Sequence, residues 1–264
     1  MKILTIISSG RKNGHTSKIT SLLEEKIKEI AVNYTDFLQF ETLFLTNYKI
    51  EHCKGCRTCI DYGEDKCPIK DDVPLIKNQM KESDAVIFAT PVYVGDVNSI
   101  MKALIDRLAY ICHRQEFYDK LALIIVTTNV TSIKRTIHTI GAATYSWGFK
   151  TIGIKGFKTS TSNDPKEILK QKYCKVISKL AKKLYSAMKE KSYLNPSILS
   201  LAIFKIQQKS RGNLDLSNEI DYKYWKENGW IDKKRQYYFD VKVSLLRRIF
   251  SMIIYGIISI VAKT

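Results

Sequence analysis

The sequence predicts an α/β protein built on a parallel sheet that carries helices on both faces. Short apolar segments rich in Ile, Leu and Val alternate with longer segments in which apolar residues recur at helical spacing. Strands that are apolar throughout are typical of a sheet covered on both sides. Their alternation with helical segments favours parallel strands joined by crossover helices.

The elements follow one another in a regular order. The apolar run Ile3–Ile7 predicts the first strand, and Thr16–Ala31 predicts a helix whose apolar face includes Ile19, Leu23 and Ile27. The same patterns place the other elements. Further strands are expected at Phe37–Leu45, Ala85–Ala89, Leu121–Val126 and Thr151–Phe157, and further helices at Asp71–Ser83, Ser99–Tyr110, Ser132–Trp147 and from Pro165 to about Met188.

Length and charge divide the chain into two parts. The 264 residues suffice for one sizeable core and an appendage, and 45% hydrophobic residues are ordinary for a globular protein. Residues 1–150 carry 20 basic and 17 acidic side chains, whereas residues 151–264 carry 23 and 9. We therefore expect a domain over 1–190 and a basic helical extension over 191–264. Such a charge is compatible with an anionic partner or with a solvated lysine-rich surface.

The beginning of the chain does not resemble a secretory signal. Ser8 interrupts the first apolar run after five residues, and no small-residue cleavage site follows. A cytoplasmic location is therefore expected. Cysteines are normally reduced there, so a cluster of them favours a metal site over disulfides.

The segment Ser8–Ser17 joins the first strand to the first helix. It holds two glycines, and the order of strand, loop and helix aims backbone N–H groups and the positive end of the helix at one point, which suits a phosphate. Neither of the common glycine-rich nucleotide-binding motifs is present. The alternative is an ordinary turn capped by Ser or Thr. Further donors to a phosphate are the hydroxyls of Ser9, Thr16 and Ser17 and the guanidinium of Arg11.

Two more loops leave the carboxyl ends of strands, where ligands bind in sheets of this kind. In Thr90–Asn98, Gly95 permits close backbone approach and Tyr93 can pack on a flat ligand. Thr127–Thr131 offers the polar groups of Thr127, Thr128 and Asn129. A phosphate loop, a ring-packing loop and a polar loop together suit a phosphorylated planar heterocycle, of which flavin mononucleotide (FMN) is the obvious example.

A cysteine run carries a second kind of chemistry. Two C-x-x-C steps share a residue, and a fourth cysteine follows after seven intervening residues and precedes a proline. This spacing is typical of ferredoxin-style ligation of a [4Fe–4S] cluster. Structural zinc, and thiols that bind no metal, are the alternatives. The proposed ligands are Cys53, Cys56, Cys59 and Cys67.

Together these motifs resemble a known family. Ser-x-Arg-Lys-Asn-Gly-His-Thr after the first strand, Cys-x-Gly-Cys-x-x-Cys…Cys-Pro-x-x-Asp-Asp, Thr-Pro-Val-Tyr and the Lys102…Asp106-Arg107 segment are similar to those of the NAD(P)H-dependent FMN reductases, in particular their iron–sulfur flavoprotein branch. The resemblance covers residues 1 to about 190. It implies a flavodoxin-like, doubly wound five-stranded parallel sheet in the order 2-1-3-4-5. It also implies a homodimer or homotetramer.

The resemblance assigns FMN to the three loops. Gly10 and His15 stand where proline and asparagine are commoner in the family, which leaves the backbone donors in place. The phosphate is expected at Ser9, Arg11, Asn13, Gly14, His15, Thr16 and Ser17, and the ring at Pro91, Val92, Tyr93, Val94 and Gly95, with Thr127, Thr128 and Asn129 alongside. His15 has the alternative of being merely solvated, and Asp96 that of capping a turn rather than donating a proton.

The expected function is electron transfer through the flavin. A hydride passes from NAD(P)H to FMN, and the electrons leave for a quinone-like or other small acceptor, or for a protein partner through the cluster. A non-enzymatic flavodoxin-type carrier is one alternative. A thiol- or metal-based redox sensor is another. The pattern identifies no catalytic acid or base.

The extension beyond residue 190 is apolar and basic. Helices are predicted at Pro196–Lys209 and Val243–Ala262, and Asp221–Trp230 mixes aromatic and charged residues. From Ile249 to Ala262 there are 14 residues without a charge, fewer than the ~20 that cross a bilayer.

Three roles for this extension remain open. It can cap its own subunit or a partner, and it can lie on a membrane with Lys242, Arg247, Arg248 and Lys263 near lipid phosphates. It can also close over the flavin through Tyr224, Trp225 or Trp230. Nucleic acid is not expected, since no nucleic-acid-binding signature accompanies the charge.

Overall fold

The computed structural model describes residues 1–129, 133–191, 194–213, 215 and 217–261. The chain forms two compact units, which we describe separately. The first unit comprises residues 1–54, 69–109 and 116–192, and the second comprises 55–68, 110–115 and 193–264. The extension expected from residue 191 therefore shares its unit with two earlier segments, one of which carries most of the cysteine run.

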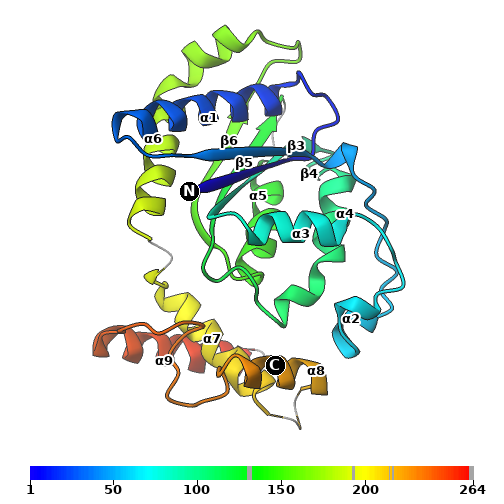
Figure 1. Cartoon of the computed structure of the whole chain (residues 1–264), viewed down its shortest axis with the longest axis vertical. Helices are drawn as coiled ribbons and strands as arrows, with labels where there is room; N and C mark the ends of the chain where they lie inside the picture. Colours follow the sequence, from blue (N-terminus) through cyan, green and yellow to red (C-terminus); the bar gives the residue numbers. More distant parts are fainter. Residues whose placement is uncertain (130–132, 192–193, 214, 216, 262–264) are drawn as a thin grey trace. The chain divides into compact units, whose positions relative to one another are not determined.

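The first unit is built on a parallel sheet (Figure 1). The strands lie in the order β2-β1-β3-β5-β6, which confirms the doubly wound order 2-1-3-4-5 expected for five parallel strands. Every residue of β5 is buried, as its wholly apolar first six residues predict. The strands are β1 (Lys2–Ile7), β2 (Gln39–Phe44), β3 (Ala85–Tyr93), β5 (Leu121–Thr128) and β6 (Lys150–Lys158).

Helices cover both faces of this sheet, because each has one apolar stripe to bury. Helices α1 and α6 pack against each other along one face, and α3 and α4 lie on the opposite side of the sheet (Figure 1). Helix α5 packs on β5 and β6. The bounds are α1 (His15–Asn33), α3 (Val73–Lys81), α4 (Ser99–Arg107), α5 (Ile133–Ser146) and α6 (Lys166–Lys189).

Two strands run further than the sequence predicts. Strand β3 continues to Tyr93 because Val92 pairs with Val97 of the short antiparallel strand β4 (Asp96–Val97). Val94 and Gly95 both have positive φ, at 48° and 82°, so this hairpin closes in a tight two-residue turn. The expectation of a simple loop over Thr90–Asn98 was therefore wrong.

The third expected loop is also shorter than predicted. Thr127 and Thr128 continue β5 because they pair with Phe157 and Lys158 of β6, so they are strand residues rather than loop residues. Asn129 follows the strand. The end of this loop at Thr131 and the expected helix start at Ser132 lie outside the described residues.

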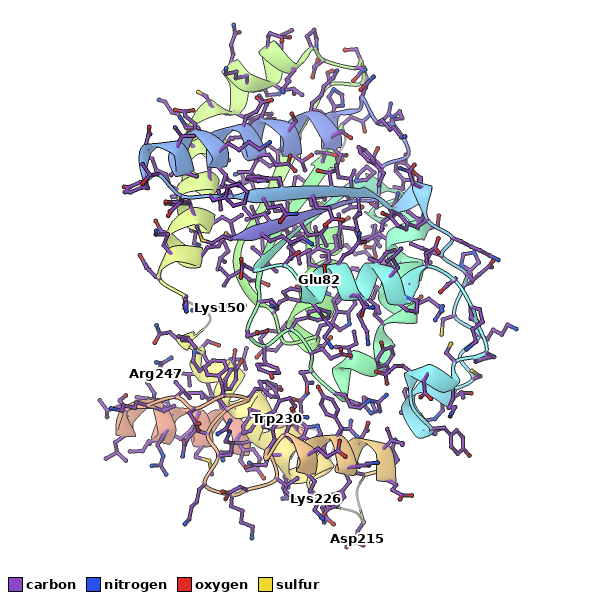
Figure 2. The ribbon with its side chains drawn as sticks, viewed as in Figure 1. Glu82, Lys150, Asp215, Lys226, Trp230 and Arg247 are labelled. Atoms are coloured by element: carbon purple, nitrogen blue, oxygen red, sulfur yellow. The ribbon has the colours of Figure 1, made fainter. Side chains whose placement is uncertain are left out.

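The second unit has its own aromatic core. Trp230 (Figure 2) and Trp225 are buried and pack edge-to-face at 5.3 Å between ring centroids, with Phe204, Tyr237 and Tyr238 around them. Both indoles are enclosed here, so the expectation that they provide ring surface for a flavin was wrong. The helices of this unit are α2 (Thr58–Asp61), α7 (Ile198–Arg211), α8 (Glu219–Glu227) and α9 (Leu245–Val261). Within the described part of the chain, we find no helix with both the length and the hydropathy to cross a bilayer.

Candidate functional site

A pocket with a volume of about 490 Å³ opens at the carboxyl edge of the sheet, in the first unit. This is the edge where doubly wound sheets bind ligands, and the volume is in the range of small-molecule sites. Four chain segments line it: those that follow β1, β5 and β6, and the end of β3 itself. The lining residues are Ser9, Arg11, His15, Thr16, Pro91, Val92, Tyr93, Val94, Thr127, Thr128, Asn129, Thr159, Ser160 and Thr161.

The loop after β1 is shaped to receive an anion. Gly14 is the N-cap of α1, and its amide N–H donates to the Arg11 carbonyl at 3.0 Å. A Cβ at this position would lie 3.1 Å from the same carbonyl oxygen, so glycine allows the turn to close. Glycine also has no side chain with which to cap the helix. The first-turn N–H groups of α1 have no intrahelical partner, and together with the helix dipole they favour negative charge at this point.

Hydroxyl pairs hold the walls of the pocket together. Thr16 Oγ1 lies 2.7 Å from Thr127 Oγ1, which links the start of α1 to the end of β5. Ser8 Oγ donates to Thr90 Oγ1 at 2.8 Å, and the Asn98 amide donates to the Ser8 carbonyl at 2.6 Å. All five side chains are buried. These contacts fix the spacing between the loop after β1 and the β3–β4 hairpin.

His15 is a buried wall residue rather than an exposed loop residue. Its side chain is 9% exposed, and its Nε2 accepts a hydrogen bond from the Asp164 amide N–H at 3.0 Å. Burial lowers the pKa of His15 below its usual value, an effect that the Asp164 carboxylate opposes and that Lys18 and Arg11 reinforce. An Nε2 that accepts a hydrogen bond places the proton of the neutral imidazole on Nδ1.

The segment after β6 completes the pocket, and the sequence reasoning missed it. Thr159 donates its amide N–H to the Thr128 carbonyl at 2.7 Å, and Ser160 Oγ donates to Asp164 Oδ1 at 2.6 Å. The hydrogen bond from Ser160 holds the pKa of Asp164 below its usual range. A signal was available: the run Thr159–Asp164 is rich in hydroxyls and follows a strand, as the other loops do.

The structure brings together most of the side chains expected at this site. Asn13 and Ser17 lie elsewhere, on a neighbouring surface pocket that also includes Lys12 and Phe44. Gly14 and Gly95 shape the loops but do not belong to the described lining. Asp96 accepts hydrogen bonds from the Val97 amide at 2.7 Å and from Thr139 Oγ1 at 2.8 Å. It therefore braces the hairpin.

The cysteine loop belongs mainly to the second unit. Cys56 is exposed, Cys59 and Cys67 are partly buried, and Cys53 lies in the first unit. Positive φ angles at Gly55 (64°) and Arg57 (61°) bend the loop sharply. No group of three or more metal-ligating side chains converges within the described residues. Four thiols at this spacing match a cluster in donor chemistry, and the iron–sulfur site stays a prediction.

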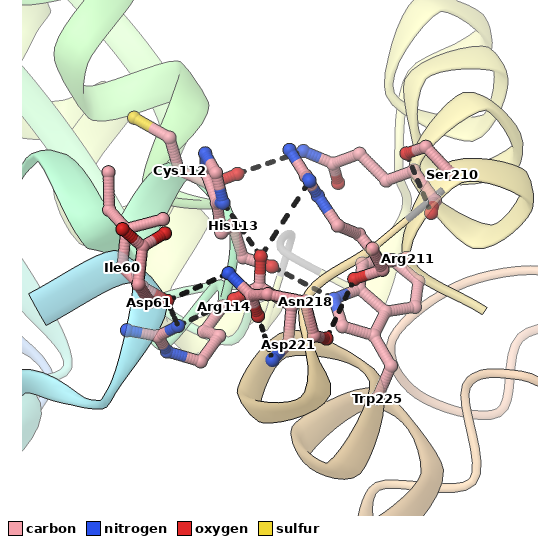
Figure 3. A network of polar contacts seen from close by, with 12 residues as sticks. Ile60, Asp61, Cys112, His113, Arg114, Ser210, Arg211, Asn218, Asp221 and Trp225 are labelled. Atoms are coloured by element: carbon pink, nitrogen blue, oxygen red, sulfur yellow. Dashed lines mark hydrogen bonds and ion pairs between the residues drawn. The ribbon is translucent and has the colours of Figure 1, made fainter. Parts of the chain in front are cut away.

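One arginine anchors this loop to the helical extension (Figure 3). Arg114 donates to the Cys59 carbonyl and to the Asp221 carboxylate, each at 2.5 Å. Asn218, from the start of α8, donates to the Ile60 carbonyl at 2.9 Å. The Cys59 carbonyl is therefore held by a residue 55 positions away in the sequence, and the adjacent Ile60 carbonyl by one 158 positions away. No local pattern could have indicated this contact.

Asp221 is the centre of that network. Its carboxylate has no exposed surface, and it lies 2.7 Å from His113 Nδ1 and 3.7 Å from Arg211 Nη1 (Figure 3). Burial would raise the pKa of Asp221, but hydrogen bonds and charge from His113 and Arg114 outweigh it and hold the pKa below its usual range. A buried carboxylate paired in this way keeps its charge at neutral pH.

The order of the sheet and the pocket at its carboxyl edge define a flavodoxin-like protein. A solved flavone reductase has the same fold, with a TM-score of 0.56 and 17% identity over 72% of this chain and 63% of that one. The NADPH-dependent FMN reductase family matches residues 1–154, and the chain belongs to this family. It is therefore an FMN-dependent oxidoreductase.

The curated relatives are iron–sulfur flavoproteins. One from Archaeoglobus fulgidus is 31% identical over 233 residues, which is 88% of this chain and the whole of that protein. Another, from Methanocaldococcus jannaschii, is 38% identical over 107 residues, which is 40% of this chain and 51% of that protein. The similarity to the first therefore extends well beyond the residues that the family matches.

Proposed function

We propose that the pocket at the carboxyl edge of the sheet binds FMN and that the protein oxidises NAD(P)H with it. The observation that carries this proposal is the position of the pocket. It lies over the uncapped N-terminus of α1 and is bounded by Arg11 on one side and by the β3–β4 hairpin on the other. Bound FMN would supply the acceptor of the hydride and the store of its two electrons.

The residues of this chain would hold and orient the cofactor. The first-turn amides of α1, the hydroxyls of Ser9 and Thr16 and the guanidinium of Arg11 suit the phosphate. Tyr93 and Val94 are exposed at the tip of the hairpin and suit one side of an apolar ring system. Among the described residues that line the pocket, Arg11 carries a positive charge and none is a carboxylate, which favours an anionic ligand.

Titration with FMN tests the binding site. Flavin fluorescence should be quenched as FMN binds, and Arg11→Ala should weaken binding by about tenfold, because a charge-assisted hydrogen bond to phosphate is lost. Lys12→Ala is the matched control, since Lys12 carries the same charge one residue away but lines a different pocket. If the two variants bind FMN with equal affinity, the phosphate does not bind at Arg11.

Turnover distinguishes an enzyme from a carrier. With FMN bound, NADH or NADPH should be consumed in steady state when a quinone or another small acceptor is supplied. Flavin that is reduced by partner proteins but by neither nucleotide would favour the carrier. Absence of any bound flavin after purification, together with failure to bind added FMN, would contradict both functions.

We also propose that Cys53, Cys56, Cys59 and Cys67 hold a [4Fe–4S] cluster. The donor chemistry and the names of the curated relatives support this proposal. Protein purified without oxygen should contain about four iron and four sulfide per chain. Cys56→Ser should lower the iron content severalfold, whereas Cys174→Ser, another exposed cysteine, should leave it unchanged. Zinc in place of iron would overturn the assignment.

A further inference from the structure

Helix α9 presents an apolar face to the solvent. Seven large apolar side chains along it are between 48% and 69% exposed. At about 100° per residue they fall within roughly 160° of the helix circumference, so they form one continuous stripe. These residues are Leu245, Leu246, Ile249, Phe250, Met252, Ile253 and Ile257.

The opposite side of α9 faces the protein. Ser251 is buried, and α9 packs along α7. Arg247 (Figure 2) donates to the Pro196 carbonyl, at the start of α7. A surface helix normally buries its apolar stripe and exposes its polar side chains. In α9 this arrangement is reversed, and a continuous exposed apolar stripe of this size marks an interaction surface.

Positive charge lines the edge of the same helix. A surface pocket of about 480 Å³ is formed by α7, α9 and the segment between α8 and α9. The described residues that line it include Lys205, Lys233 and Arg248 and no carboxylate. Burial and the nearby charge of Arg248 lower the pKa of Lys205. Residues 193–264 carry 12 basic and 6 acidic side chains, so the surroundings are also positive. Any partner of this face should be apolar and negatively charged.

We propose that α9 docks the protein on a membrane surface rich in anionic phospholipid. The stripe would enter the boundary between headgroups and acyl chains, and Lys233, Arg248 and Lys242 would face the lipid phosphates. An amphipathic helix that lies in this plane does not need the length to cross the bilayer. Charge decides against a second copy of this chain, because two such faces in contact would bring their arginines and lysines together. The proposal uses the second unit alone and does not depend on flavin binding.

Cosedimentation with lipid vesicles tests this docking. The full chain should bind vesicles of phosphatidylcholine with about one third phosphatidylglycerol at least tenfold more tightly than pure phosphatidylcholine vesicles. Binding should weaken as sodium chloride is raised. Sodium phosphate at the same ionic strength should have no greater effect than chloride. Stronger competition by free phosphate would assign the cationic pocket to a soluble ligand and overturn the proposal.

Two double variants distinguish the contribution of the apolar stripe to vesicle binding from the contribution of positive charge. The double variant Ile249→Glu, Ile253→Glu should lose vesicle binding by at least about tenfold. The double variant Lys242→Glu, Arg248→Glu should lose the preference for anionic lipid. Ile168→Glu on α6 is the matched control, because this isoleucine is 50% exposed in the first unit, and it should bind as the parent protein does.

Folding and assembly are checked on the same samples. Tryptophan emission, recorded with Trp147 of the first unit replaced by Phe so that only Trp225 and Trp230 emit, reports whether the second unit is intact in each variant. Parent protein that ignores anionic vesicles, or an intact stripe variant that binds them normally, would overturn the proposal. So would a parent dimer that the stripe variant converts to monomer without any vesicle binding, since the occupant would then be a second copy.

Discussion

His15 and Asp221 show how buried hydrogen-bond partners give a titratable side chain a defined protonation state. His15 is held as an acceptor by the Asp164 amide, and Asp221 is held as an anion by His113 and Arg114. Neither residue depends on solvent for its partner. A buried polar group that loses its partner costs more than the hydrogen bond itself contributes. Substitution at either residue should therefore have a measurable effect.

His15 should make the stability of the first unit depend on pH. Its folded-state pKa is lowered from the usual 6.5, so the unfolded chain binds the proton more readily. The contribution of His15 is complete above that unfolded value and is lost as pH falls through the lower folded value. Urea unfolding between pH 7.5 and 5 should show this decline in the parent protein, and His15→Gln, which keeps an acceptor without titrating near neutrality, should show a shallower one.

A direct titration of the His15 side chain is the control for this prediction. An NMR titration of the His15 ring should give a midpoint below 6.5. A midpoint above that value, or identical pH profiles for the parent and the glutamine variant, would show that burial does not favour the neutral ring.

Asp221→Asn should destabilise the second unit by roughly 3 kcal/mol, because it removes the buried counter-charge of the Arg114 guanidinium and leaves only the more exposed Glu64, at 3.5 Å. The measurement is denaturant unfolding followed by the emission of Trp225 and Trp230, with Trp147 of the first unit replaced by Phe in both proteins. Asp61→Asn is the control, since its exposed pair with Arg57 should contribute no more than about 1 kcal/mol. Equal effects of the two substitutions would mean that the Arg114 network is energetically unimportant.

Glycines decide how closely helix α5 approaches the sheet. Gly156 on β6 faces Ile133 at the start of α5, and a Cβ there would lie 2.6 Å from Ile133 Cδ1. Gly141, inside α5 itself, has open space around its Cα. Two glycines near one helix therefore play different parts: the first permits packing, and the second only weakens the helix.

Alanine substitution should separate these parts. Gly156→Ala should cost about 1–3 kcal/mol of unfolding free energy, since Ile133 must move to make room. Gly141→Ala should stabilise the protein by about 0.5–1 kcal/mol through helix propensity. Thermal and urea unfolding measure both variants. A neutral result for Gly156→Ala would show that the start of α5 shifts freely.

The two compact units should respond separately to the cofactor. Each has its own core: the sheet of the first unit and the aromatic cluster around Trp225 in the second. Cooperative blocks of this kind open independently in hydrogen exchange. Ligand that binds one block stabilises that block by mass action.

Hydrogen exchange with and without FMN measures this separation. At about 100 times the dissociation constant, FMN should raise the opening free energy of β1, β3 and β5 by roughly 2.7 kcal/mol. Amides of α7 and α8 should exchange at unchanged rates. Equal protection of both units would show that they unfold together, and protection confined to the second unit would place the cofactor outside the proposed pocket.

Local patterns were sufficient to predict a parallel sheet covered by helices, whereas the strand order was implied by the family resemblance. Buried strands such as β1 and β5 are apolar along most of their length, and helices such as α1 repeat their apolar residues every three or four positions. The loop from Ser9 to Thr16 was recognisable for the same reason, since a strand, a glycine-containing turn and a helix start follow one another within a few residues. These properties depend on neighbours in the chain, and the sequence records them directly.

Contacts between distant residues could be found only in the folded chain. The pairing of β4 with β3, the place of Thr159–Thr161 in the pocket and the Arg114–Asp221 ion pair all depend on which segments meet in space. The periodicity of α9 shows that it is a helix, but packing against α7 determines that its apolar stripe faces outward. Long-range packing selects one partner among many of similar chemistry, and no local pattern encodes that choice.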